Sequence, residues 1–144
     1  MRRGWLLTAG IGLLALGAQG PSELRAVRTV RPIHLDGHLD EGAWTEAIPL
    51  RTTFTQAWPE YGKPSPLETE VRVLYDAHHL YVGARMRNPM GRKGVVRRLH
   101  RRDQDSQSDW FTVFIDSLFD RRTALGFSVN AAGVQRDTLH VGDQ

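Results

Sequence analysis

The sequence predicts an all-β fold, an antiparallel β-sandwich with one or two short helices, truncated at its C-terminal end. Short runs in which apolar and polar residues alternate are separated by Gly, Pro, Asn and Asp, which is the pattern of antiparallel strands. Only one segment has helical spacing. With 144 residues, 40% of them hydrophobic, the chain has room for one domain. It stops at Gln144, directly after a predicted strand, so we expect the sandwich to be the front part of a longer polypeptide.

The clearest hairpin is predicted at residues 70–75 and 80–88. Apolar side chains occupy every second position of both runs, and the residues at 76–79, Asp-Ala-His-His, make a short polar connection. Weaker strand patterns are present at 32–35 and 52–57. These four runs predict the first part of the sandwich.

Three further strands are predicted in the second half of the chain. The run at 109–116 has apolar residues on both of its faces, which is typical of a strand buried within a sandwich. The runs at 123–130 and 134–141 are joined by Ala-Ala-Gly at 131–133. They therefore predict a second hairpin.

One short helix is predicted after residue 40. Asp40 is expected to accept hydrogen bonds from the free backbone N–H groups of the first turn, and Glu41 complements the helix dipole. An apolar face that contains Trp44 follows, and Pro49 ends the helix. Burial is the expected role of Trp44 and also of Trp110 in the 109–116 strand.

The N-terminus has the pattern of a secretory signal peptide. Arg2 and Arg3 precede an apolar stretch at 5–18 and a run of small residues, and this stretch is too short and too rich in Gly to span a bilayer. The predicted organisation is a signal peptide at 1–20 and the sandwich domain at 21–144. The protein is therefore expected to be exported, to a periplasmic, outer-membrane-associated or extracellular location.

Charge argues against a nucleic-acid partner. Without Arg2 and Arg3, 17 basic side chains face 16 acidic ones, which is too little charge to neutralise a row of phosphates. The only dense basic run is 92–102. We expect it to be a solvated loop or a short helix.

The sequence assigns no catalytic residue. The absence of Cys excludes disulfides, zinc-thiolate sites and thiol nucleophiles, and no Gly-x-Ser-x-Gly turn is present. Carboxylate pairs occur at Asp36 with Asp40 and at Asp116 with Asp120. Spacing alone does not make such pairs catalytic, but if the chain is part of an enzyme, an O-glycosyl hydrolase is the class we expect.

No cofactor is assigned with certainty, and calcium is the cation that the carboxylates fit best. Hard cations take several oxygen ligands, and a secreted sandwich without disulfides can use one to hold its loops. The candidate ligands are Asp36, Asp76 and Asp116. A haem held by a His and Met86 is a second possibility, although a Met on an alternating strand belongs more often to a core.

Two aromatic residues stand in a loop stiffened by Pro and Gly. The segment at 58–64 reads Trp-Pro-Glu-Tyr-Gly-Lys-Pro, where a core position for Trp58 or Tyr61 is hard to arrange. Sugar rings present C–H faces that stack on such side chains. Rim packing remains the alternative role for Trp58.

Five blocks of the chain together resemble family 9 carbohydrate-binding modules. They are Ile-His-Leu-Asp-Gly-His-Leu-Asp-Glu-Gly-Ala-Trp at 33–44, Thr-Glu-Val-Arg-Val-Leu-Tyr-Asp at 69–76, Leu-Tyr-Val-Gly-Ala at 80–84, Asp-Trp-Phe-Thr-Val-Phe-Ile-Asp at 109–116 and Phe-Ser-Val-Asn-Ala-Ala-Gly-Val-Gln-Arg-Asp at 127–137. With Arg-Arg-Asp at 101–103 and Asp-Arg-Arg-Thr at 120–123, the chain most resembles the module that precedes a β-barrel in bacterial outer-membrane proteins of unknown function.

The resemblance implies a β-sandwich that binds saccharide, commonly attached to glycoside hydrolases such as xylanases and holding calcium in some members. Family members clamp a sugar at the chain end between two Trp residues. Trp44 and Trp110 match motif positions here, and Trp58 is the candidate for one side of a clamp. On the saccharide-binding hypothesis, Trp58 and Tyr61 stack on the glycan, and its candidate hydrogen-bonding partners are Arg85, Asn130 and Gln135.

Two functions stay open at this point. The first is a non-catalytic carbohydrate-binding module of an exported bacterial protein, linked to polysaccharide catabolism, with a polysaccharide or oligosaccharide as its partner. The second is a structural or protein-interaction domain that packs on a downstream outer-membrane β-barrel. Exposed Arg and aromatic side chains would contact protein in that case.

Overall fold

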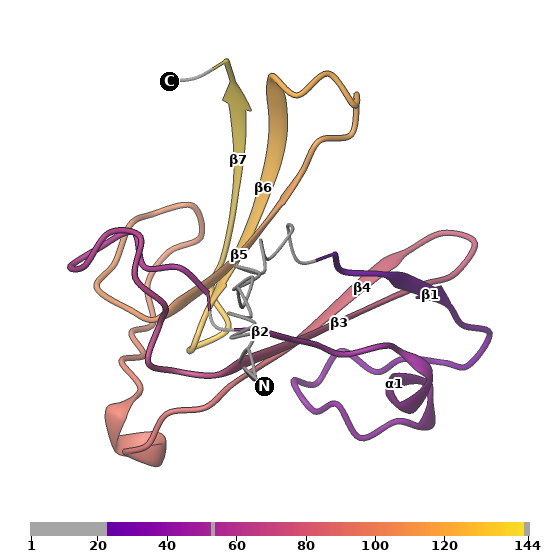
Figure 1. The fold of residues 1–144 in the computed structure, drawn as a ribbon, viewed down its shortest axis with the longest axis horizontal. Coiled ribbons are helices and arrows are strands. Elements are labelled where there is room, and N and C mark those ends of the chain that lie inside the picture. The colour runs from indigo at the N-terminus through magenta and orange to yellow at the C-terminus, as the bar shows by residue number, and fades with distance from the viewer. Residues whose placement is uncertain (1–22, 53, 143–144) are drawn as a thin grey trace, which may run out of the picture. The chain divides into compact units, whose positions relative to one another are not determined.

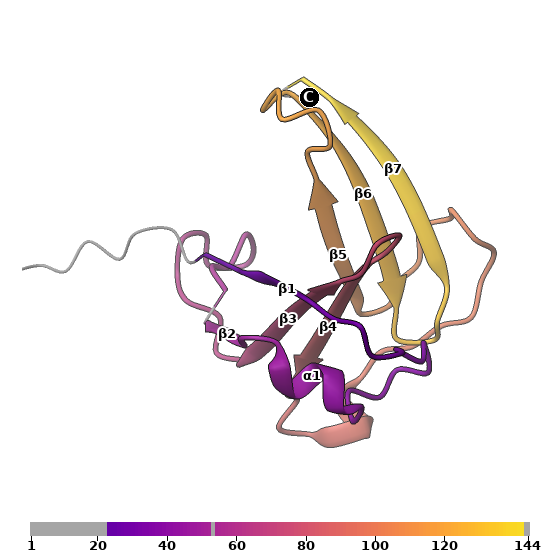
Figure 2. The ribbon, with the colours of Figure 1, turned by 90° about the vertical axis from the view of Figure 1, so that its right-hand side faces the viewer.

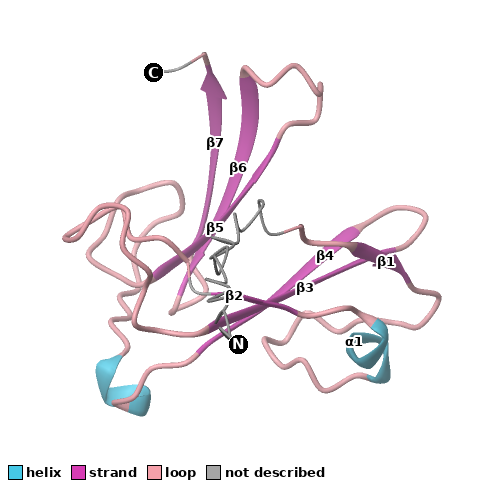
Figure 3. Cartoon of the chain, viewed as in Figure 1, coloured by secondary structure: helices cyan, strands magenta, loops and turns pink. Residues whose placement is uncertain are grey.

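The computed structural model describes residues 23–52 and 54–142, so the predicted signal peptide lies outside the described residues. The all-β prediction is confirmed: within the described ranges, seven strands form two sheets, with one short α-helix and one 3-10 turn (Figures 1 and 3). The elements are β1 Ala26–Arg28, α1 Gly42–Glu46, β2 Leu50–Thr52, β3 Thr69–Tyr75, β4 Leu80–Met86, η1 Gly91–Gly94, β5 Trp110–Ile115, β6 Thr123–Asn130 and β7 Gln135–Val141. Neither helical segment within these ranges has the length and apolarity needed to cross a membrane.

The chain folds into two compact units, and each is built from two separate stretches of sequence. Among the described residues, unit 1 is formed by 23–52 together with 70–84, and unit 2 by 54–69 together with 85–142. Unit 1 contains α1 and most of the first sheet. Unit 2 contains η1 and the second sheet.

The first sheet is organised around β3. This strand pairs with β1, β2 and β4, and the predicted 70–75 and 80–88 hairpin is confirmed as β3 and β4. The pairing of β1 with β3 is parallel, with Ala26 opposite Val73, whereas the prediction was of antiparallel strands. The backbone N–H of Thr29 extends this pairing by donating to the carbonyl of Tyr75 at 2.8 Å.

The buried core of unit 1 lies between α1 and β3. Ala43, Trp44 and Ala47 of the helical segment pack with Leu74, which confirms burial for Trp44. Arg72 of β3 reaches the open C-terminal end of α1, where its Nη1 donates to the carbonyls of Trp44 at 2.5 Å and Ala47 at 3.2 Å. The short helix therefore depends on β3 both for its apolar contacts and for its C-terminal hydrogen bonds.

The start of the helix differs from the prediction. The residue at the N-cap is Glu41 and not Asp40, and its side chain makes no capping bond to the helix. The Glu41 carboxylate instead accepts from the backbone N–H of His34 at 2.7 Å and from Nε1 of Trp44 at 2.9 Å. These bonds lower the pKa of Glu41, with the His34 N–H as the largest cause.

Both weaker strand predictions are wrong. Residues 32–35 form no strand, and the segment is tied to the start of α1 by the bond from His34 to Glu41. In place of a strand at 52–57, β2 ends at Thr52, and Thr55 makes an isolated bridge to Pro64. Runs this short have little pairing energy of their own, so their surroundings decide the structure.

The second sheet has the strand order β5-β6-β7, and both pairings are antiparallel (Figure 2). The predicted hairpin between β6 and β7 is confirmed. Gly133, with φ +82°, occupies the left-handed position at the end of its turn, and its N–H donates to the carbonyl of Asn130 at 2.9 Å. A residue with a Cβ would be strained there.

One face of the second sheet is apolar on β5, on most of β6 and over the second half of β7, while Gln135 and Asp137 lie on the same face at the start of β7. The strand register places every second side chain on this face. Several are well exposed, among them Phe127 at 49% and Leu139 at 67%. We call this set the apolar face: Phe111, Val113, Ile115, Leu125, Phe127, Val129, Leu139 and Val141.

The outer edge of β7 is partly closed by a loop residue. Asp103, at φ 61°, donates its backbone N–H to the carbonyl of Gln135 at 3.2 Å and accepts from the backbone N–H of Asp137 through Oδ1 at 3.2 Å. These two contacts imitate a neighbouring strand over the first half of β7.

Candidate functional site

The loop between β2 and β3 forms a small hydrogen-bonded hairpin that carries both aromatic candidates. The backbone N–H of Gln56 donates to the carbonyl of Lys63 at 2.8 Å, and the Gly62 N–H donates to the carbonyl of Gln56 at 3.0 Å. The Gln56 side chain adds a bond to the carbonyl of Pro64 at 3.0 Å. The loop backbone is therefore held by its own contacts.

Trp58 and Tyr61 are displayed at the tip of this loop. Trp58 is 85% exposed and Tyr61 is 89% exposed, so neither ring takes part in a core. The two residues are three positions apart, which limits their Cα separation to about 10 Å. Glu60 and Lys63 of the same loop form an ion pair of 2.6 Å and add polar groups to the loop. This arrangement offers ring faces together with hydrogen-bonding groups, as saccharide binding requires.

A cleft of about 590 Å³ in unit 2 contains two residues that the sequence singled out, Trp110 and Asn130. Its wall also includes Val95 and Met86, which the sequence analysis did not connect with this place. The sequence signals for it were the Asp-Trp pair at 109 and 110 and the candidate ligand residue Asn130, which all line the cleft.

Asn130 lies at the end of β6 and is 4% exposed. Its Oδ1 accepts from the backbone N–H groups of Ala132 and Val134, both at 2.9 Å, and its Nδ2 donates to the carbonyl of Arg98 at 2.9 Å. The second Nδ2 proton points to Nε2 of His100 at 3.2 Å. All four hydrogen-bonding positions of the amide are thus used within the chain.

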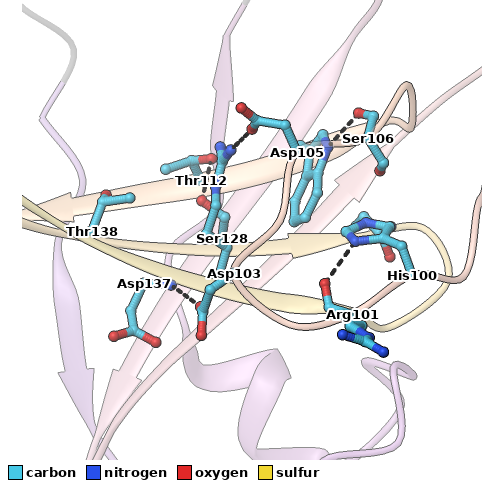
Figure 4. A network of polar contacts seen from close by, with 12 residues as sticks. His100, Arg101, Asp103, Asp105, Ser106, Thr112, Ser128, Asp137 and Thr138 are labelled. Atoms are coloured by element: carbon cyan, nitrogen blue, oxygen red, sulfur yellow. Dashed lines mark hydrogen bonds and ion pairs between the residues drawn. The ribbon is translucent and has the colours of Figure 1, made fainter.

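Gln135 begins β7 in a network of charged side chains. Its Oε1 accepts from Nη1 of Arg102 at 3.0 Å, and the same guanidinium pairs with Asp137 and Asp103. Asp103 and Asp137 lie next to each other at the edge of β7 in Figure 4. Gln135 is itself exposed, and only the oxygen of its side-chain amide is engaged in this network.

Trp110 is held by polar partners on the other face of the second sheet. Its Nε1 donates to the carbonyl of Ser106 at 3.3 Å, and the Arg136 guanidinium lies 4.9 Å from its ring centroid. Arg136 also pairs with Asp105. Trp110 is half-buried, which fits the structural role expected of it.

Arg85 lies on β4, one residue before its end, and is exposed. Among the residues described, no hydrogen bond or ion pair involves its side chain. Its guanidinium is therefore available to a ligand. The structure shows no contact between Arg85 and the aromatic loop.

The three calcium candidates each serve as the acceptor of a local turn. Asp36 accepts from the N–H of His38 at 2.8 Å, and Asp116 accepts from the N–H of Arg121 at 2.8 Å. Asp76 accepts from the N–H groups of His78 and His79, both at 2.7 Å, and from the Tyr81 hydroxyl at 2.8 Å.

These contacts affect the titration of Asp76. The His78 N–H, then the Tyr81 hydroxyl and the His79 N–H, hold the pKa of Asp76 well below its ordinary value of 3.8. The N–H groups of Arg122 and Thr123 lower the pKa of Asp120, which the sequence analysis paired with Asp116. Both carboxylates are thus kept ionised as turn acceptors, whereas a general acid needs a raised pKa.

No cluster of three or more His, Asp or Glu side chains suited to a metal ion occurs within 23–52 and 54–142. Asp36 and Asp76 belong to unit 1, and Asp116 belongs to unit 2. Met86, the haem candidate, is exposed at the end of β4. Calcium and haem binding remain predictions from the sequence.

Comparison of the chain with family models, with curated proteins and with solved structures gives no match.

Proposed function

We propose that this chain is a non-catalytic saccharide-binding module of an exported protein, of the kind that family 9 carbohydrate-binding modules represent. The observation that carries the proposal is the pair of exposed rings, Trp58 and Tyr61, on a loop that is held by its own hydrogen bonds. Exposing two large rings has no benefit for folding, because each loses the gain of burial. A sugar surface that stacks on them recovers it.

The polar groups beside the rings support a saccharide over a purely apolar ligand. Glu60 and Lys63 lie in the same loop as the rings and can exchange their exposed ion pair for sugar hydroxyls at little cost. Binding through one or two stacked sugars is expected in the millimolar to micromolar range, which corresponds to about 4 to 8 kcal/mol.

Calorimetric titration of the whole chain with xylo- and cello-oligosaccharides tests the proposal. We expect binding by the wild type and a loss of at least about tenfold in affinity for Trp58→Ala and for Tyr61→Ala. Phe119→Ala is the matched control, since Phe119 is also a highly exposed ring but lies in the β5–β6 loop. A folded wild type that binds neither sugar, or equal losses in all three variants, would contradict the proposal.

A second candidate function is protein interaction through the apolar face. The specific observation is the exposure of Phe127, Leu139 and Val141 on one side of a sheet, since such patches mark interaction sites. On this proposal the face packs on a protein partner such as a downstream β-barrel region. Retained oligosaccharide binding after Phe127→Ser separates the two functions, because only the second needs this face.

A further inference from the structure

The basic run at 92–102 divides into paired and unpaired cations. Arg102 is engaged by Asp103 and Asp137. Within the described part of the chain, the side chains of five other cations have neither an ion pair nor a hydrogen bond: Arg92, Lys93, Arg97, Arg98 and Arg101. They are all exposed. The segment before residue 102 thus carries a concentrated positive charge that the protein does not neutralise.

The backbone of this segment is fixed in place, mainly by Asp109. Its Oδ2 accepts from the N–H of Val96 at 3.0 Å, and its own N–H donates to the carbonyl of Val96 at 2.8 Å. The Arg98 N–H donates to Oγ of Ser108 at 2.8 Å, and the Arg98 carbonyl accepts from Asn130. The prediction of a solvated segment is confirmed by its exposure, but the segment is also anchored.

Two of the unpaired arginines line one groove. The groove measures about 280 Å³ and is bounded by Arg92, Arg97, Val95 and Ala131. The alternation of side chains along an extended segment puts Val95 and Arg97 on the same side. The Ala131 wall is tied to the same anchor, since its N–H donates to the carbonyl of Asp109 at 3.0 Å.

The nearby carboxylates are already engaged. Asp109 accepts from backbone, Asp105 pairs with Arg136, and Asp103 and Asp137 pair with Arg102. The groove therefore combines two free planar cations with a small apolar wall. Guanidinium groups match carboxylates by paired hydrogen bonds, and the apolar wall suits the C–H face of a ring.

We propose that this groove binds the carboxylate of an acidic sugar unit, so that the saccharide recognised by the chain is a uronate-containing polysaccharide. The inference rests on the proposed saccharide-binding function and specifies its substrate class. A nucleic acid is disfavoured because the net charge of the chain is only +3, too little to neutralise a long row of phosphates.

The test measures binding of the whole chain to tetragalacturonate and to its fully methyl-esterified form by calorimetry. Both probes have the same rings, and only the first is charged. We expect tetragalacturonate to bind at least about tenfold more tightly. The Arg92→Gln/Arg97→Gln variant is expected to lose this preference while it still binds the ester.

Two further variants separate charge from place. Arg121→Gln/Arg122→Gln removes the same charge from the loop at the other end of β5 and is expected to keep the preference. Ala131→Phe fills the groove without changing charge, and we expect it to weaken tetragalacturonate binding. The sugar-specific site is refuted if the two double-arginine variants lose the preference for tetragalacturonate equally. It is also refuted if Arg92→Gln/Arg97→Gln weakens the binding of polyglutamate of equal charge as much as that of tetragalacturonate.

The outcomes distinguish this inference from the proposed function. Equal affinity of the wild type for the charged and esterified probes overturns the acidic-sugar site and leaves saccharide binding standing. Absence of binding to both probes and to neutral oligosaccharides overturns both proposals. Charge-dependent binding that survives Trp58→Ala supports the groove and contradicts the aromatic loop.

Discussion

Single side chains in this protein connect segments that are distant in sequence, and Asn130 is the clearest case. The sequence analysis assigned it to a ligand, but the structure uses its amide to close the β6–β7 turn and to hold the backbone of Arg98. Whether it also contacts a ligand stays a prediction. Its present contacts give it a structural role that residue type alone could not reveal, because they depend on a partner 32 positions away.

We expect Asn130→Ala to lower the free energy of unfolding by about 2 to 4 kcal/mol, because three backbone groups lose their hydrogen bonds to this buried side chain. Denaturant unfolding measures the change. Asn130→Asp keeps an oxygen that can accept both hydrogen bonds of the turn, but it removes the N–H donor to the Arg98 carbonyl. An intermediate loss of unfolding free energy is therefore expected. A change below about 0.5 kcal/mol for Asn130→Ala would contradict the assigned role.

Asp76 predicts a pH dependence of stability. Its pKa is lowered in the folded protein, so its contribution is fully present above its unfolded pKa of about 3.8 and is lost as the pH falls below that value. We expect Asp76→Asn to be less stable than the wild type at pH 7, and the gap to shrink as the pH drops below about 4. Urea unfolding of both proteins at pH 7 and below about pH 4 checks this. A difference in unfolding free energy that stays constant with pH would contradict it.

At the scale of elements, the surroundings of the strand glycines show how closely the helix and the strands pack. A Cβ on Gly83 of β4 would lie 3.0 Å from the ring of buried Trp44 and 2.8 Å from Leu39. A Cβ on Gly126 of β6 would meet Thr138 and exposed Phe114, which can both move. Adding one methyl group is therefore expected to cost more folding free energy at Gly83 than at Gly126.

We expect Gly83→Ala to destabilise the protein by about 1 to 3 kcal/mol, since overpacking against a rigid ring forces a backbone shift. Gly126→Ala serves as the control and should cost less. Thermal unfolding followed by circular dichroism ranks the two. The reverse order would show that α1 does not press on β4 as described.

Five strands and one helix could be predicted from the sequence because their patterns are long and regular. Runs of six to eight residues, such as β3 and β6, carry enough alternation to define their faces. β1 has three residues and is formed by its pairing with β3, a contact that no local pattern records. The same reason explains why 32–35 and 52–57 were mistaken for strands and Asp40 for the N-cap: in each place a non-local contact decides.

At the scale of the whole molecule, the exposed apolar face and the partly open edge of β7 favour association. Asp103 protects the first half of that edge, while Leu139 and Val141 lie beyond it and are exposed. An unprotected apolar edge strand is a template for further strands. The aromatic loop could be anticipated from its Pro and Gly residues, whereas the groove required the fold to bring 92–97 beside residue 131.

We expect Leu139→Lys to reduce self-association without loss of stability, because the side chain is already 67% exposed and a charge on an edge strand opposes pairing. Analytical ultracentrifugation over a range of concentrations measures the effect. Thr138→Lys is the matched control on the opposite face of β7. Equal behaviour of the two variants would argue that the apolar face has no part in association.

The interleaved order of the two units has a consequence for synthesis on the ribosome. Unit 1 lacks its central strands until residue 84 has been made, yet the stretch at 53–69, which belongs to unit 2, emerges before them. Unit 1 is therefore complete once residue 84 has been made, while unit 2 still lacks its second stretch, so a single cleavage after residue 84 would release all of unit 1 but would divide unit 2. Unit 1 is expected to fold first during synthesis, and unit 2 to follow when its second stretch has been made.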